Sequence, residues 1–184
     1  MNAHFPKIAI VGLIITLLIG CSNPQKELNQ KIATLEKQLM SDSSMTPIPE
    51  KAKEMIALYN DYVTKFPDDS LCANYLFKAG DLASKINNPE LAVETFSRLI
   101  SKYPKSPDAP VALFLQGFIY ENQAGNPAKA KPYYEAFLKE YPDHPLSGDV
   151  SFSLEHLGKT PEELIREFEQ NTTAADSAII SAAQ

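Results

Sequence analysis

The sequence predicts an all-α fold, a short α-solenoid of two to three stacked antiparallel helix hairpins after an N-terminal helix. An aromatic residue followed by proline recurs at a nearly constant interval, as Phe66-Pro67, Tyr103-Pro104 and Tyr141-Pro142. A fixed period within the range of about 20–50 residues is typical of repeat arrays. One repeat cannot bury its apolar face alone, so the copies must stack on one another.

The second half of each repeat has the start and stop signals of a helix. Asn88 and Asn126 can accept hydrogen bonds from the first amides of a helix, and each is followed by a proline, which suits the first helical position. Apolar residues then recur at helical spacing; in one copy they are Ala92, Phe96, Leu99 and Ile100. Pro104 and Pro142 force the preceding tyrosine out of the helical region, so the predicted helices end there.

The first half of each repeat contains a glycine inside a predicted helix. Gly80 precedes Ala92 in one copy, and Gly117 precedes Ala130 in the next at nearly the same spacing. A glycine costs a helix ~1 kcal/mol relative to alanine, so its recurrence indicates a packing requirement. We expect the second helix to cross at each glycine, with the two alanines as the small residues that face it.

These residues together resemble the tetratricopeptide repeat. The matching positions are Gly80, Ala92, Phe96 and Pro104 in one copy and Gly117, Tyr120, Ala130, Tyr134 and Pro142 in the next. The interval from each repeat proline to the next glycine is the same in both copies and resembles the longer linker of the BamD and YbgF type of envelope lipoproteins. Gln116 departs from the pattern, which has leucine there. The resemblance covers about residues 49–170 and implies a scaffold for protein–protein interactions.

Residues 1–20 predict a lipoprotein signal peptide. Lys7 precedes an uncharged apolar run that is short for a membrane span and typical of a signal-peptide core. Leu18-Ile19-Gly20-Cys21 resembles the bacterial lipobox, which implies cleavage before Cys21 and lipidation of that residue; the alternative is an ordinary signal peptide. Several acyl chains anchor a protein stably. Ser22 favours the outer membrane, facing the periplasm, by analogy with proteobacterial sorting.

Residues 21–48 predict a tether that contains a short amphipathic helix. Its apolar residues follow the 4-3-4 spacing of a coiled-coil seam; they are Leu28, Ile32, Leu35 and Leu39. Three alternatives remain: an oligomerising coiled coil at 25–40, as in YbgF-type proteins, a helix packed on the first repeat helix, or a tether helix. The helix at 50–66 has no hairpin partner in the repeat pattern. Residues 171–184 predict a disordered tail.

The composition and motifs favour binding over catalysis. The chain has 17 basic and 23 acidic residues without a Lys/Arg cluster, which argues against a nucleic-acid partner. It contains no motif of a hydrolase, a metalloprotease or a nucleotide-binding protein. His144 and His156 lie too far apart for a metal pair, and Cys72 predicts a buried thiol. We therefore expect no catalytic residues, no cofactor and no metal.

The resemblance implies a partner-binding groove on the first helix of each hairpin. Its predicted residues are Phe77, Lys78, Asp81, Phe114, Leu115, Phe118 and Glu121. Several phenylalanines on a solvated wall would indicate a binding site. The alternative is that the chain covers them itself, because Leu164, Ile165 and Phe168 form an apolar stripe at 161–170.

The leading hypothesis is a membrane-anchored interaction scaffold of the bacterial envelope, which the resemblance links to processes such as outer-membrane protein assembly. The alternative is an oligomeric coordinator of envelope or division machinery of the YbgF type, joined through the helix at 25–40. An enzyme is the third hypothesis, and the sequence lacks the residues for it.

Overall fold

The computed structural model describes residues 23–41 and 47–170. These residues form helices and no strands, so the predicted all-α stack is confirmed. The helices are α1 (Pro24–Ser41), α2 (Pro49–Lys65), α3 (Cys72–Lys85), α4 (Pro89–Lys102), α5 (Asp108–Asn122), α6 (Pro127–Glu140) and α7 (Ser147–Glu155), followed by helical residues 161–170. The predicted signal peptide, Cys21 and the predicted tail lie outside the described residues.

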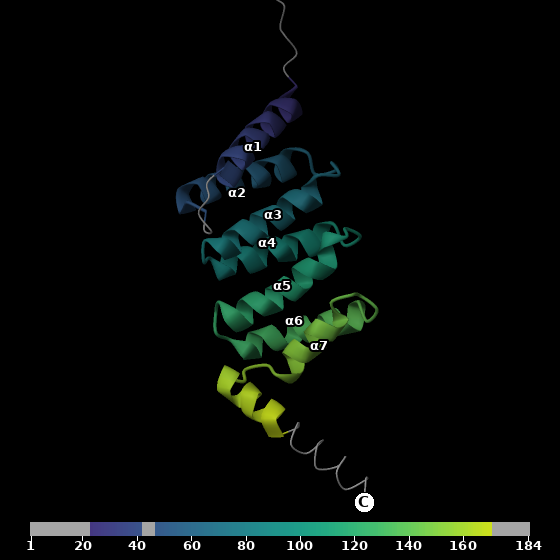
Figure 1. Ribbon diagram of the computed structural model, residues 1–184. Helices are drawn as coiled ribbons and strands as arrows, with labels where there is room; N and C mark the ends of the chain where they lie inside the picture. Colours follow the sequence, from purple (N-terminus) through teal and green to yellow (C-terminus); the bar gives the residue numbers. More distant parts are fainter. Residues whose placement is uncertain (1–22, 42–46, 171–184) are drawn as a thin grey trace, which may run out of the picture.

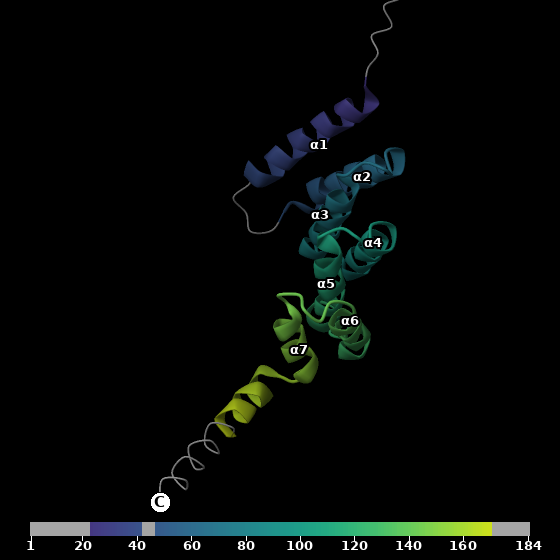
Figure 2. The same cartoon turned by 90° about the vertical axis from the view of Figure 1, so that its right-hand side faces the viewer.

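The helices stack in chain order and form two layers. Each helix from α1 to α7 packs against the next one along the chain (Figure 1). In the view turned by 90°, α1, α3, α5 and α7 lie on one side and α2, α4 and α6 on the other (Figure 2). We call these the first-helix layer and the second-helix layer. This arrangement is that of helix hairpins piled into a short solenoid.

The helix boundaries follow the local signals in the sequence. The side-chain oxygen of Asn88 accepts a hydrogen bond from the backbone amide of Leu91 at 3.2 Å, and Asn126 does the same with Lys129 at 3.0 Å. A proline occupies the first turn of α4 and of α6. Both helices end one residue before the tyrosine of a Tyr-Pro pair, because proline excludes that tyrosine from the helical region.

Each glycine of the repeat faces an aromatic ring of the second helix. A Cβ atom added to Gly80 would lie 2.6 Å from Cε1 of Phe96, and one added to Gly117 would lie 2.5 Å from Cε1 of Tyr134. The expectation that Ala92 and Ala130 face the glycines was therefore wrong. Both alanines are fully buried, but the nearest atoms to each glycine belong to the ring. The missing side chain makes room for the ring.

Gln116, which departs from the repeat pattern, is buried between α5 and α4. Its Nε2 donates hydrogen bonds to the backbone oxygen of Val93 at 2.9 Å and to Oγ of Ser97 at 2.6 Å. A buried amide is stable only where it finds such partners. This side chain therefore ties neighbouring hairpins together through hydrogen bonds where the repeat pattern has an apolar contact.

The helix α1 belongs to the stack and pairs with α2. Leu28, Ile32 and Leu35 are buried in one core cluster with residues of α2. Of the three alternatives for residues 25–40, the structure shows the helix packed on the first repeat helix. The apolar seam that suggested a coiled coil is thus covered within the chain, and α1 supplies the hairpin partner that the repeat pattern lacks.

Polar contacts also join α1 to α3. The Glu36 carboxylate accepts hydrogen bonds from Lys78 Nζ and from the Tyr59 hydroxyl, each at 2.7 Å. The hydroxyl of Tyr75 donates to the side-chain oxygen of Asn29 at 2.9 Å. Partial burial raises the pKa of Glu36, but the hydrogen bonds from Lys78 and Tyr59 outweigh that effect and hold it below its usual value. The α1 helix is therefore held by specific partners on two helices.

Substitution of Gly80 by alanine tests the contact between glycine and ring. The added methyl group would overlap the Phe96 ring, and such overpacking costs about 1–3 kcal/mol of unfolding free energy. We expect this loss to exceed the ~1 kcal/mol that alanine contributes to helix propensity. The matched control is Gly148→Ala in α7, where no atom lies within 4 Å of the added Cβ. Thermal melts should show a lower melting temperature for Gly80→Ala alone; similar values for both variants would contradict the proposed contact.

Candidate functional site

The first-helix layer carries a phenylalanine at the same repeat position in three successive helices. Phe77, Phe114 and Phe152 lie on α3, α5 and α7, each one repeat period after the last. The sequence prediction contained Phe77 and Phe114 but missed Phe152. The repeat period alone could have found it, because Phe152 lies one period after Phe114.

The α3 part of this layer is occupied by contacts within the chain. The ring of Phe77 is half-buried and lies 5.7 Å from the ring of Phe96. Lys78 is paired with Glu36, and Asp81 accepts a hydrogen bond from Lys85 Nζ at 2.7 Å. A pocket of about 240 Å³ remains between these side chains, lined by Glu36, Leu39, Tyr59, Lys78, Asp81 and Leu82. The predicted groove residues of α3 thus lie beside α1, with their charges paired.

The α5 part of the layer exposes an aromatic side chain. Phe118 is 42% exposed, and its ring centroid lies 6.0 Å from that of Phe114. Phe114 is half-buried and stacks on the ring of Tyr134 at 6.0 Å. Leu115, also predicted to line the groove, is half-buried against the larger core cluster. Phe118 is therefore the most accessible of the predicted groove residues on this helix.

Glu121 lies next to these rings and is fixed by Tyr134. The Tyr134 hydroxyl donates a hydrogen bond to Oε2 of Glu121 at 2.7 Å, while the tyrosine side chain itself is buried. Burial, together with the hydrogen bond to Glu121, raises the pKa of this hydroxyl. The structure thus places Phe114, Phe118 and Glu121 near one another, with Phe114 and Glu121 both in contact with Tyr134.

Helical residues 161–170 lean on α7 and leave Phe118 open. The ring of Phe168 stacks on that of Phe152 at 6.3 Å and lies 6.1 Å from the ring of His156. Figures 1 and 2 show this helix continuing beyond α7, away from α5. Phe152 and Phe168 remain 46% and 51% exposed. We call Phe114, Phe118, Phe152 and Phe168 the aromatic strip.

This last helix begins with a capping box. The backbone amide of Thr160 donates to Oε2 of Glu163 at 2.8 Å, and the amide of Glu163 donates to Oγ1 of Thr160 at 3.2 Å. The reciprocal pair satisfies two amides that a helix start leaves without helical partners. It sets the direction in which the chain leaves α7.

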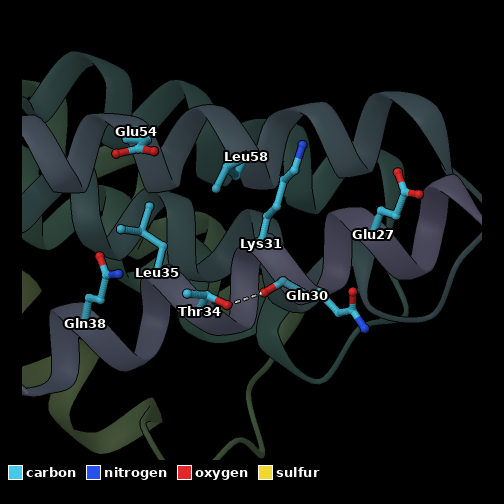
Figure 3. A pocket seen from close by; sticks show the side chains of 8 residues that line it. All are labelled: Glu27, Gln30, Lys31, Thr34, Leu35, Gln38, Glu54 and Leu58. Carbon is cyan, nitrogen blue, oxygen red and sulfur yellow. Dashed lines mark hydrogen bonds between the residues drawn. The ribbon is translucent and has the colours of Figure 1, made fainter.

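A surface groove lies between α1 and α2, at the end of the stack opposite to α7 (Figure 3). Its lining residues are Glu27, Gln30, Lys31, Thr34, Leu35, Gln38, Glu54 and Leu58. Most of these side chains are polar or charged, and Leu35 is buried. This end has the polar outer face that a terminal repeat needs for solubility. It offers no aromatic anchor.

The His, Cys, Asp and Glu side chains of the described residues do not gather into a metal site. Within residues 23–41 and 47–170, no cluster of three His, Cys, Asp or Glu side chains could hold a metal ion. The Cys72 thiol is buried, as predicted, and donates to the backbone oxygen of Phe66 at 3.0 Å. Burial raises the pKa of that thiol, which disfavours the reactive thiolate. None of the helices in the same ranges has the length and apolarity of a membrane span.

The exposure of Phe118 can be tested by comparing the effects of Phe118→Ala and Phe96→Ala on the unfolding free energy. Truncating a core phenylalanine costs about 3–5 kcal/mol of unfolding free energy, and we expect this for Phe96→Ala, which also empties the space against Gly80. Phe118→Ala should cost clearly less unfolding free energy than Phe96→Ala, because Phe118 is 42% exposed whereas Phe96 is fully buried. Chemical denaturation of both variants measures the difference. Equal losses would place Phe118 in the core.

Comparison with known proteins supports the repeat assignment. The tetratricopeptide repeat profile matches residues 75–106 and 111–144, which contain most of α3 and α5 and all of α4 and α6. A search of curated proteins finds no match. Two tetratricopeptide repeats are therefore found within residues 75–144, and this repeat is a scaffold for protein–protein interactions.

Proposed function

We propose that the protein is a membrane-anchored scaffold of the bacterial cell envelope that holds a protein partner on its first-helix layer, in a process such as outer-membrane protein assembly. The observation that carries the binding part of this proposal is the aromatic strip. Side chains as large as Phe118, Phe152 and Phe168 remain between 42% and 51% exposed in the same half of the stack. Contiguous exposed apolar surface on a soluble domain usually marks an interaction site.

The anchoring part of the proposal rests on the sequence before α1. Lys7, the apolar run that follows it and the lipobox-like residues before Cys21 support lipidation of that cysteine. Because α1 begins at Pro24, the anchor would lie within ~10 Å of this helix. The α1 end of the stack would then be close to the membrane. The aromatic strip, at the other end, would face the aqueous compartment.

The structure does not favour the alternative in which copies of the chain associate through the helix at 25–40. That alternative depended on an apolar seam at 25–40, and Leu28, Ile32 and Leu35 of that seam are buried inside the stack. We therefore propose a scaffold without assuming self-association through α1.

Replacement of Cys21 by serine tests the anchor. The lipid is the only strong membrane signal that the proposal leaves after cleavage, so the variant should move from the membrane pellet to the soluble fraction. The matched control is Cys72→Ser, the other cysteine of the chain, which should remain in the pellet. A Cys21→Ser protein that still sediments with membranes would show that another element anchors the chain.

Photo-crosslinking in cells tests the binding surface. A benzoylphenylalanine at position 118 should give a discrete protein adduct, because this position lies in the aromatic strip. The same residue at position 135 serves as the control, since Glu135 is exposed on α6 in the second-helix layer. Adducts from 135 but not from 118 would move the binding surface to the other layer and remove the main support for the proposal.

A further inference from the structure

We infer that the partner of the aromatic strip is a peptide segment that carries apolar side chains next to a lysine or arginine. This inference rests on the proposed function, in which the strip is the binding surface. It adds the chemistry of the partner, argued from the charges that surround the strip.

The strip consists of two pairs of neighbouring rings, one on α5 and one shared by α7 and the last helix. Phe118 contacts Phe114, and Phe114 stacks on Tyr134. The Tyr134 hydroxyl donates a hydrogen bond to Glu121 on α5. Phe152 then stacks on Phe168. A bound segment could therefore place several apolar side chains along one surface.

The charge around the strip is mainly negative, although the last helix also carries Arg166. Both α5 and α7 lack lysine and arginine, and they carry the carboxylates of Asp108, Glu121, Asp149 and Glu155. The lysines of this half of the stack lie on α6, in the second-helix layer; they are Lys129, Lys131 and Lys139. Beyond α7, Lys159 is paired with Glu167. Negative charge thus prevails on the helices that carry the aromatic rings.

Glu121 is the carboxylate best placed to meet a partner. The buried Tyr134 holds its position through the 2.7 Å hydrogen bond, so little side-chain freedom remains to be lost on binding. A carboxylate on the partner that met Glu121 would be repelled by its like charge. A lysine or arginine would form a charge-assisted hydrogen bond.

The α3 part of the first-helix layer differs from this surface both in its aromatic side chains and in its charges. Asp81 lies one repeat period before Phe118, at the equivalent position, so the aromatic anchor is absent there. Lys78 and Lys85 are already paired with Glu36 and Asp81. The combination of exposed rings with negative charge is therefore confined to the α5–α7 half of the stack.

A random library of short peptides displayed on phage tests this chemistry. The full-length protein serves as the target, and Phe118→Ser serves for counter-selection, so that surviving peptides depend on the strip. We expect these peptides to be enriched in apolar residues adjacent to lysine or arginine. The most enriched one is then synthesised with a fluorescent label, together with a twin that has glutamate in place of each basic residue.

Fluorescence anisotropy compares the two peptides on matched variants. Phe118→Ser should weaken binding about tenfold or more, and Glu121→Gln about threefold to tenfold, with the second effect shrinking as salt rises. The controls are Leu71→Ser, a comparably exposed apolar residue at the start of α3, and Glu135→Gln on α6; both should leave the affinity unchanged. The glutamate twin should bind more weakly than its parent.

The outcomes separate this inference from the proposed function. Peptides that depend on Phe118 but are acidic, or a twin that binds as well as its parent, would overturn the charge inference and leave the scaffold in place. If no peptide depends on Phe118 while position 118 still crosslinks to a protein in cells, the partner class is wrong and the scaffold stands. If both experiments fail, the strip is not the binding surface.

Discussion

The contact between a glycine of the first helix and an aromatic ring of the second helix is the constraint on which the α3–α4 and α5–α6 hairpins depend. Gly80 receives Phe96, and Gly117 receives Tyr134, at distances that leave no room for a side chain. This contact also decides what faces outward. Residues three before and one after the glycine share another face of the helix, because they are four apart. In α5 these residues are Phe114 and Phe118, so the packing inside the hairpin determines the surface outside it.

The two ends of the stack differ in how polar a face they show to solvent. At the first end, α1 buries its apolar seam on α2 and shows solvent a mostly polar groove. At the other end, helical residues 161–170 pack on α7 but leave Ile165 and Phe168 58% and 51% exposed. Terminal repeats need a polar outer face for solubility. The apolar surface is thus concentrated at one end, where a partner can reach it without competing with α1.

The sequence predicted what local signals determine and missed what depends on distant partners. Asn88, Pro89 and their equivalents lie at helix ends, so the boundaries of α4 and α6 followed directly. The seam of α1 has the same spacing whether it meets another copy or its own α2, so the sequence left that choice open. The glycine was recognised as a close approach, but the facing residue was misidentified, because it depends on the angle at which the helices cross. The burial of Gln116 could not be foreseen either, since its acceptors, Val93 and Ser97, lie on a different helix.

For the candidate site, the repeat period predicted which residues occupy equivalent positions, but not which side chains surround them. Phe77 and Phe114 occupy equivalent places, yet the surface beside Phe77 is filled by α1 and by paired charges, whereas Phe114 borders the exposed Phe118. The residue that follows the glycine is an aspartate in one copy and a phenylalanine in the next. Because the fold repeats the same geometry in each copy, it cannot by itself distinguish one partner from another. What the protein recognises therefore depends on the differences between its repeats. One of these differences, Asp81 against Phe118, lies on the surface where the partner is proposed to bind.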